Sequence, residues 1–216
     1  MPSSRTNMTT GRSSWCWAWL TVAALTTTSA GQAQEPVRGF AVERFSPSPP
    51  GAGWLIMDSL DMHPGLGAAA SVTTGYARNP LRLGMGNGSY LAVVSKEVFA
   101  DLGVAVTYNR FRFYANLSNP LIVYGKSGKV DRYEYRAPSV DIPGHPDLLS
   151  DTRIGVDARI FGEAKSPFRL GASGQLVVPS GDREDYITDG TYRGMVRVLV
   201  AGDTGGIAYA GNVGVH

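Results

Sequence analysis

Residues 150–216 read SDTRIGVDARIFGEAKSPFRLGASGQLVVPSGDREDYITDGTYRGMVRVLVAGDTGGIAYAGNVGVH, and apolar residues recur at every second position in segments of about ten residues. One such segment carries Ile154, Val156, Ala158 and Ile160, with Arg153, Gly155, Asp157 and Arg159 between them. Because successive side chains of a β-strand point to opposite faces, this spacing predicts a strand with one apolar and one polar face. The same pattern extends back to Gly65.

The connections between the predicted strands alternate in length. We expect strands near 72–76, 104–108, 111–117, 153–160, 168–176, 192–200 and 207–215. Long connections are predicted at 78–96, 124–150 and 179–190, and tight turns at 109–110, 163–167 and 203–206. This alternation is typical of outer-membrane barrels, which carry long loops at one rim and short turns at the other. Segments of roughly 9–12 residues also match the length that spans a bilayer better than soluble strands do.

We therefore predict an all-β, antiparallel up-and-down transmembrane β-barrel, incomplete, with about seven strands present. Bacterial single-chain barrels have an even number of strands, at least eight, so we expect residues 65–216 to be a partial outer-membrane β-barrel and the chain to be a fragment. A soluble β-sandwich would bury the same apolar face. A secreted or periplasmic β-sandwich binding module is therefore the alternative.

The N-terminal region has the composition of a secretory signal. Arg5 and Arg12 are its only charged residues, an apolar stretch follows, and the small residues before Ala33 predict cleavage after that position. We expect residues 1–33 to be a signal peptide and 34–64 an N-terminal extension that acts as a plug, a cap or a lead-in segment. Without the leader, 18 basic and 18 acidic residues remain, so the basic pI does not indicate nucleic-acid binding. The single cysteine, Cys16, lies in the leader.

The C-terminal stretch quoted above resembles the N-terminal barrel region of OmpA-family outer-membrane proteins. The most specific element is the strand that ends in Val178-Pro179-Ser180-Gly181-Asp182, followed by Asp189-Gly190-Thr191-Tyr192. The segments 38–40, 52–54 and 75–80 resemble the same family. The resemblance implies an outer-membrane location, with lipid and lipopolysaccharide as partners. It implies peptidoglycan binding only through a C-terminal domain that is missing from this sequence.

The polar face of the predicted strands supplies the candidate site. Its members would line the barrel lumen: Arg112, Arg153, Asp157, Arg159, Arg169, Gln175, Arg193 and Arg197. One hypothesis is an electropositive passive pore, since rings of arginine favour anions. The other is a network of salt bridges and hydrogen bonds that plugs the interior, because side chains can fill a barrel of about eight strands.

No motif predicts catalysis, a cofactor, a metal site or nucleic-acid binding. Asp182, Glu184, Asp185 and Asp189 share one predicted loop, which is either a cation site or, more simply, a solvated loop. With His145, the first three are the only residues from which an outer-membrane enzyme could build a site at the rim. We expect a structural or passive-pore protein and not an enzyme.

Overall fold

The computed structural model describes residues 38–141 and 149–216. The predicted signal peptide and His145 lie outside the described residues. All regular secondary structure within them is β-strand. Across this part of the chain, no helix is long and apolar enough to cross a membrane.

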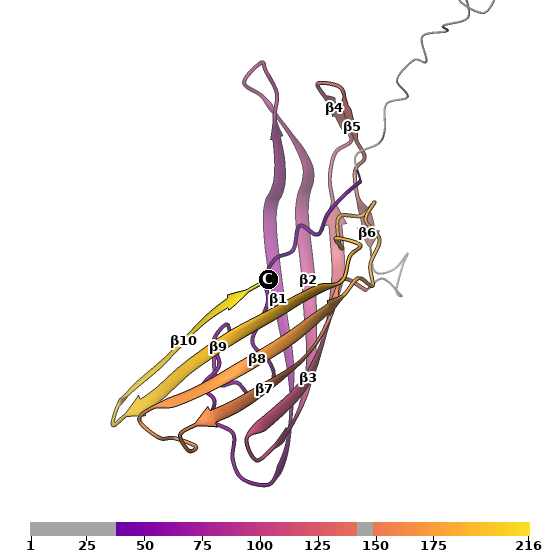
Figure 1. Ribbon diagram of the computed structural model, residues 1–216. Coiled ribbons are helices and arrows are strands. Elements are labelled where there is room, and N and C mark those ends of the chain that lie inside the picture. Colours follow the sequence, from indigo (N-terminus) through magenta and orange to yellow (C-terminus); the bar gives the residue numbers. More distant parts are fainter. Residues whose placement is uncertain (1–37, 142–148) are drawn as a thin grey trace, which may run out of the picture. The chain divides into compact units, whose positions relative to one another are not determined.

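Seven antiparallel strands form a sheet that curls into a half-barrel (Figure 1). Their order is β1-β2-β3-β7-β8-β9-β10, and the short strand β6 extends the pairing of β3. The bounds are β1 Leu66–Gly84, β2 Tyr90–Tyr108, β3 Phe111–Tyr124, β6 Ser139–Asp141, β7 Thr152–Phe161, β8 Arg169–Val178, β9 Arg193–Thr204 and β10 Ile207–Val215. A separate hairpin joins β4 Gly128–Val130 to β5 Tyr133–Tyr135.

The structure confirms the all-β antiparallel class and the seven predicted strands, and it corrects one connection. The predicted long connection at 78–96 is wrong, because β1 and β2 continue as a paired hairpin as far as Gly84 and Tyr90. A register shift after Arg78, with Asn79 at φ 51° and Pro80 beside it, breaks the alternation that sequence reasoning followed. Proline is tolerated there because it lies at this irregularity, where neither Asn79 nor Pro80 has a register partner on β2.

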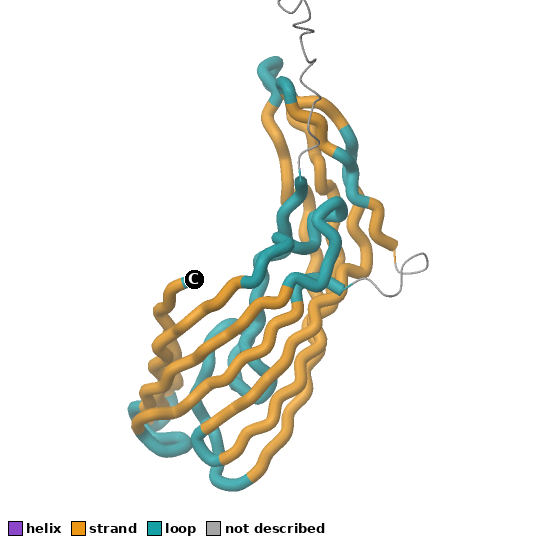
Figure 2. The backbone as a smooth tube through the Cα atoms, turned by 45° about the vertical axis from the view of Figure 1, so that its right-hand side comes forward, coloured by secondary structure: helices purple, strands orange, loops and turns teal. Residues whose placement is uncertain are grey.

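The two ends of the half-barrel differ. Turns 109–110, 162–168 and 205–206 lie at one end, which we call the lower end (Figure 2). The turn 85–89 and the segments after β3 and β8 lie at the other, the upper end. There a small core, which we call the upper lobe core, consists of Leu91, Val93, Val94, Val123, Val140, Tyr186 and Ile187.

One face of the sheet is apolar and exposed, and the other is charged and buried. In a water-soluble protein the apolar face is the buried one. On β2, Leu102, Val104 and Val106 are exposed, whereas Asp101 and Ala105, which alternate with them, are buried. We call the exposed side the convex face and the other side the concave face. β3, β7 and β8 repeat the pattern, with buried arginines at 112, 153, 159 and 169. The period of two places apolar side chains outside and charged side chains inside.

Residues 38–64, the N-terminal segment, run along the concave face before the chain turns into β1 at Gly65 (Figure 1). At the lower end, Leu60 and Met62 pack against Leu199 and Ala201. Farther up, the segment approaches β2 at Gly103, where an added Cβ would lie 2.7 Å from Cγ of Pro50. The concave face therefore has glycine at a point where the segment passes close to β2.

We predict that Gly103→Val lowers the free energy of unfolding by about 1–3 kcal/mol, because the new side chain has to displace Pro50 of the N-terminal segment together with Ser71 and Asn116 of the neighbouring strands. Gly174→Val is the matched control, since no atom lies within 4 Å of its Cβ position. It should be neutral or slightly stabilising, because valine favours strands. Urea unfolding of both variants checks this. Equal stability of the two variants would contradict the close packing that Pro50, Ser71 and Asn116 make around Gly103.

Candidate functional site

The candidate site is the polar concave face together with the N-terminal segment that crosses it. The structure places Arg112, Arg153, Asp157, Arg159, Arg169 and Gln175 on this face as buried side chains, with Arg193 and Arg197 half-buried beside them. Alternation along β3, β7, β8 and β9 brings these eight predicted residues to one side of the sheet. Their partners come largely from residues that sequence reasoning did not select.

Arg112 lies at the centre of the lower half of the interior and is 1% exposed. Its Nη1 forms an ion pair with Asp58 of the N-terminal segment and lies 3.5 Å from a carboxylate oxygen of Asp157. Its Nη2 donates a hydrogen bond of 2.9 Å to the carbonyl of Gly51. Each partner lowers the cost of burying the guanidinium charge, and the segment supplies two of the three partners of Arg112.

Two further arginines hold the same segment by its backbone. Arg159 donates to the carbonyl of Leu60 at 3.1 Å, and Arg169 donates to the carbonyl of Ser59 at 2.8 Å. Neither forms an ion pair with any acid in residues 38–141 or 149–216. The two arginines therefore bind the carbonyls of two consecutive residues, so these bonds do not depend on which side chains the segment carries.

Arg153 organises the middle of the interior. It forms an ion pair with Asp101 of β2 and donates to the carbonyl of Phe45 in the N-terminal segment. Asp101 also accepts a hydrogen bond of 2.7 Å from Nδ2 of Asn116. Three strands and the segment thus share one buried network.

Arg197 and Gln175 form a second network on β8 and β9. Nη2 of Arg197 lies 3.2 Å from Oε1 of Gln175, 3.2 Å from Oγ of Ser173 and 3.3 Å from the hydroxyl of Tyr114. Tyr114 also donates to Oε1 of Gln175 at 3.2 Å. These bonds tie β3, β8 and β9 together across the interior.

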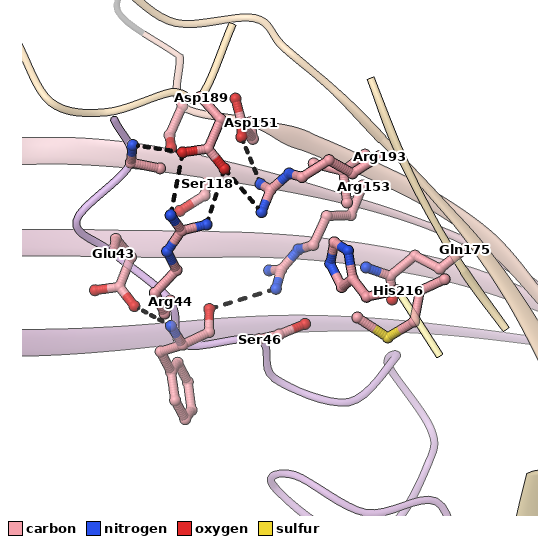
Figure 3. A pocket seen from close by; sticks show the side chains of 15 residues that line it. Glu43, Arg44, Ser46, Ser118, Asp151, Arg153, Gln175, Asp189, Arg193 and His216 are labelled. Carbon is pink, nitrogen blue, oxygen red and sulfur yellow. Dashed lines mark hydrogen bonds and ion pairs between the residues drawn. The ribbon is translucent and has the colours of Figure 1, made fainter. Parts of the chain in front are cut away.

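A cavity of about 520 Å³ lies toward the upper end, between the N-terminal segment and β7–β9 (Figure 3). Asp189 sits at its wall between two arginines, 2.8 Å from Arg44 and 3.0 Å from Arg193. Arg193 also pairs with Asp151 at 2.8 Å. Positive and negative groups alternate along this wall, so the cavity has no strong preference for one sign of charge.

The Asp189 carboxylate fixes the start of the N-terminal segment to the loop before β9. It accepts a hydrogen bond of 2.9 Å from the backbone N–H of Ala41. Burial acts to raise the pKa of Asp189, but the hydrogen bonds from Arg44 and Ala41 and the charge of Arg193 hold that pKa below its usual value. The interaction is therefore strongest when the carboxyl is ionised.

The acidic loop predicted as a possible cation site is dispersed in the structure. Glu184 pairs with Arg136 at 2.8 Å and Asp185 accepts from the backbone of Ser139, while Asp189 points into the interior. Within the described ranges, no group of three metal-binding side chains could hold an ion. These exposed pairs contribute little to stability, and the loop joins the upper lobe core through Tyr186 and Ile187.

Sequence reasoning missed Asp58, Asp101 and Asp151, each of which neutralises an interior arginine. Asp101 belongs to the polar face of β2, but the strand was expected to begin after it. Asp58 lies in a region without strand periodicity, so no pattern pointed to it. The predicted interior contained six arginines but only one acid, Asp157. This excess of positive charge is the signal that further carboxylates had to lie nearby.

Comparison with known proteins adds no relatives: no protein-family model, curated protein or solved structure matches this chain.

We predict that Asp58→Asn destabilises the protein and loosens the N-terminal segment. Removing one member of a buried ion pair costs about 3–5 kcal/mol, and we expect the lower end of that range because Asp157 remains near Arg112. The control is Asp61→Asn in the same segment, which removes a backbone bond from Lys165 and a longer-range attraction to Arg159 but no ion pair among the described residues. Unfolding titrations and limited proteolysis of residues 38–64 provide the measurement. Unchanged protease protection in Asp58→Asn would contradict the clamp.

Proposed function

We propose that this chain forms the wall of a Gram-negative outer-membrane β-barrel with a structural role, exported through its N-terminal signal. The observation that carries the proposal is the inversion of the two faces of the sheet. A buried face rich in arginine and an exposed face of valine, leucine and phenylalanine are costly in water. The same arrangement is favourable when lipid surrounds the sheet and polar groups meet inside it.

The order of side chains along the convex face supports a membrane location. Its middle is apolar, with Val72, Val104, Phe113, Ile154, Val196 and Val198 among the exposed residues. Tyr76 and Tyr192 are exposed toward the upper end, and Tyr108, Phe111, Phe161 and Phe168 toward the lower end. Aromatic girdles on either side of an apolar band are characteristic of outer-membrane barrels, because these rings favour the interface.

The filled interior favours a structural role over a passive pore. The N-terminal segment occupies the concave face, and the interior arginines hold it through Asp58 and four backbone carbonyls. A passive pore would need this space to contain water. The resemblance to OmpA-family barrels agrees with the structural role.

Closure of such a barrel follows from the directions of the strands. Within the described residues, β1 and β10 each pair on one side only. β1 and β10 are the first and the seventh strand of the sheet. Because neighbouring strands are antiparallel, these two run in the same direction. An odd number of further antiparallel strands would pair with both edges and satisfy their backbone groups, as lipid requires.

The alternative of a β-sandwich binding module needs a second layer. Two sheets of a sandwich cover each other's apolar faces at about 10 Å. In the described part of the chain, the exposed apolar face has no covering sheet, and the covered face is the charged one. The geometry therefore favours the membrane-spanning interpretation.

Fractionation of cells that export the protein tests the proposal. We expect it in the outer membrane, with an SDS gel mobility that changes on boiling, because the closed barrel that forms when both β1 and β10 are paired resists the detergent until heated. A periplasmic product with no mobility shift would contradict the proposal and favour the binding module.

A charge on the convex face gives a second test. We predict that Val198→Arg reduces the folded fraction, since arginine at a lipid-facing midplane position costs about 2–4 kcal/mol. Tyr133→Arg is the control, because Tyr133 on β5 is similarly exposed, at 44% against 47%, but lies outside the sheet of the half-barrel. The folded fraction is read from unboiled gels. If water surrounds the convex face, both substitutions should be equally harmless.

A further inference from the structure

Arg78 and Lys96 form a pair of like charges on the convex face. They are register partners on β1 and β2, so their side chains leave the sheet on the same side. Arg78 continues the exposed series Val72, Thr74, Tyr76, and Lys96 is also exposed. Directly opposed side chains have Cβ atoms about 4.5–5.5 Å apart, and like charges there repel each other.

No described carboxylate relieves this repulsion. Neither Arg78 nor Lys96 takes part in an ion pair within residues 38–141 and 149–216. The acid adjacent to Lys96 in sequence, Glu97, is 2% exposed and points to the opposite face. The pair therefore favours an external anion that can bridge two cations.

The position of the pair relative to the apolar band identifies the anion. Arg78 lies two residues beyond Tyr76, whose ring belongs to the upper aromatic girdle, and the strand bulges immediately after it. Beyond the bulge, Arg82 lies over the ring of Tyr90 at 5.3 Å. Basic residues just outside an aromatic girdle lie at the depth of lipid headgroups. This level is at the upper end, which carries the longer connections that face outward in such barrels.

We infer that Arg78 and Lys96 bind a phosphate group of the outer-leaflet glycolipid, lipopolysaccharide, on the outer wall of the barrel. This inference rests on the proposed membrane location. Two cations on adjacent strands can each donate to one phosphate, and the anion removes their mutual repulsion. The site faces the surrounding lipid, so it is independent of the interior networks and of the cavity near Asp189.

The test is equilibrium binding of lipid A to the protein folded in uncharged detergent micelles. The variant Arg78→Gln/Lys96→Gln should bind about thirty-fold more weakly than the unchanged protein, since each basic residue near an anionic surface contributes roughly fivefold. Dephosphorylated lipid A should bind both proteins equally weakly.

The control variant is Lys129→Gln/Arg136→Gln, which removes the same charge from the upper end. Both side chains are strongly exposed and pair only with exposed acids, so folding should be unaffected. It should bind lipid A like the unchanged protein. If it loses as much affinity as the first variant, general attraction to positive charge explains binding and the assigned site is wrong.

Three further results would overturn the inference. Equal lipid A affinity of Arg78→Gln/Lys96→Gln and the unchanged protein would do so, as would phosphatidylglycerol binding as tightly as lipid A. The heat-dependent gel mobility of every variant is measured first, because it shows whether the barrel has formed. It therefore separates failure of the lipid-binding inference from failure of the proposed function. A folded barrel with charge-independent binding contradicts the lipid site alone, whereas an unchanged protein that is water-soluble contradicts both proposals.

Discussion

Buried guanidinium groups on one face of the sheet set the constraint on which the rest of the structure depends. Arg112, Arg153, Arg159 and Arg169 are each at most 8% exposed. A buried charge that lacks partners is strongly destabilising, so these side chains require carboxylates and carbonyls at fixed positions inside the half-barrel. The N-terminal segment answers this requirement with Asp58 and the carbonyls of residues 45, 51, 59 and 60. The sheet and the segment are therefore one folding unit.

The same constraint determines what the outer face can be. Because a strand alternates its side chains, a charged interior leaves the apolar residues outside, and here they form a band between two sets of aromatic rings. Water penalises this surface and lipid favours it. The proposals of a membrane-spanning wall and of a phosphate-binding pair at its upper margin both follow from this arrangement. The first depends on the apolar band and the second on two cations just beyond it.

Sequence reasoning predicted the sheet well because period-two patterning is local. The segments near 153–160, 168–176 and 192–200 became β7, β8 and β9, and all eight predicted interior residues share the concave face. Sequence reasoning failed where the structure does not follow a local period of two. The bulge at Asn79 and Pro80 shifts the register and concealed the upper half of the first hairpin. The partners Asp58 and Phe45 lie in a segment whose path is fixed by contacts with distant strands, and no local periodicity encodes such contacts.

The most direct test of the central claim measures what surrounds each face. The sequence has a single cysteine, Cys16, which lies in the predicted leader, so single spin labels can be placed at 195, 196, 197 and 198 on β9 of the protein in lipid vesicles. Collision rates with oxygen, which dissolves in lipid, and with a water-soluble nickel complex report the environment. The account predicts high oxygen access and low nickel access at 196 and 198, and low oxygen access at 195 and 197. High nickel access at 196 and 198 would place water against the apolar face and contradict the account.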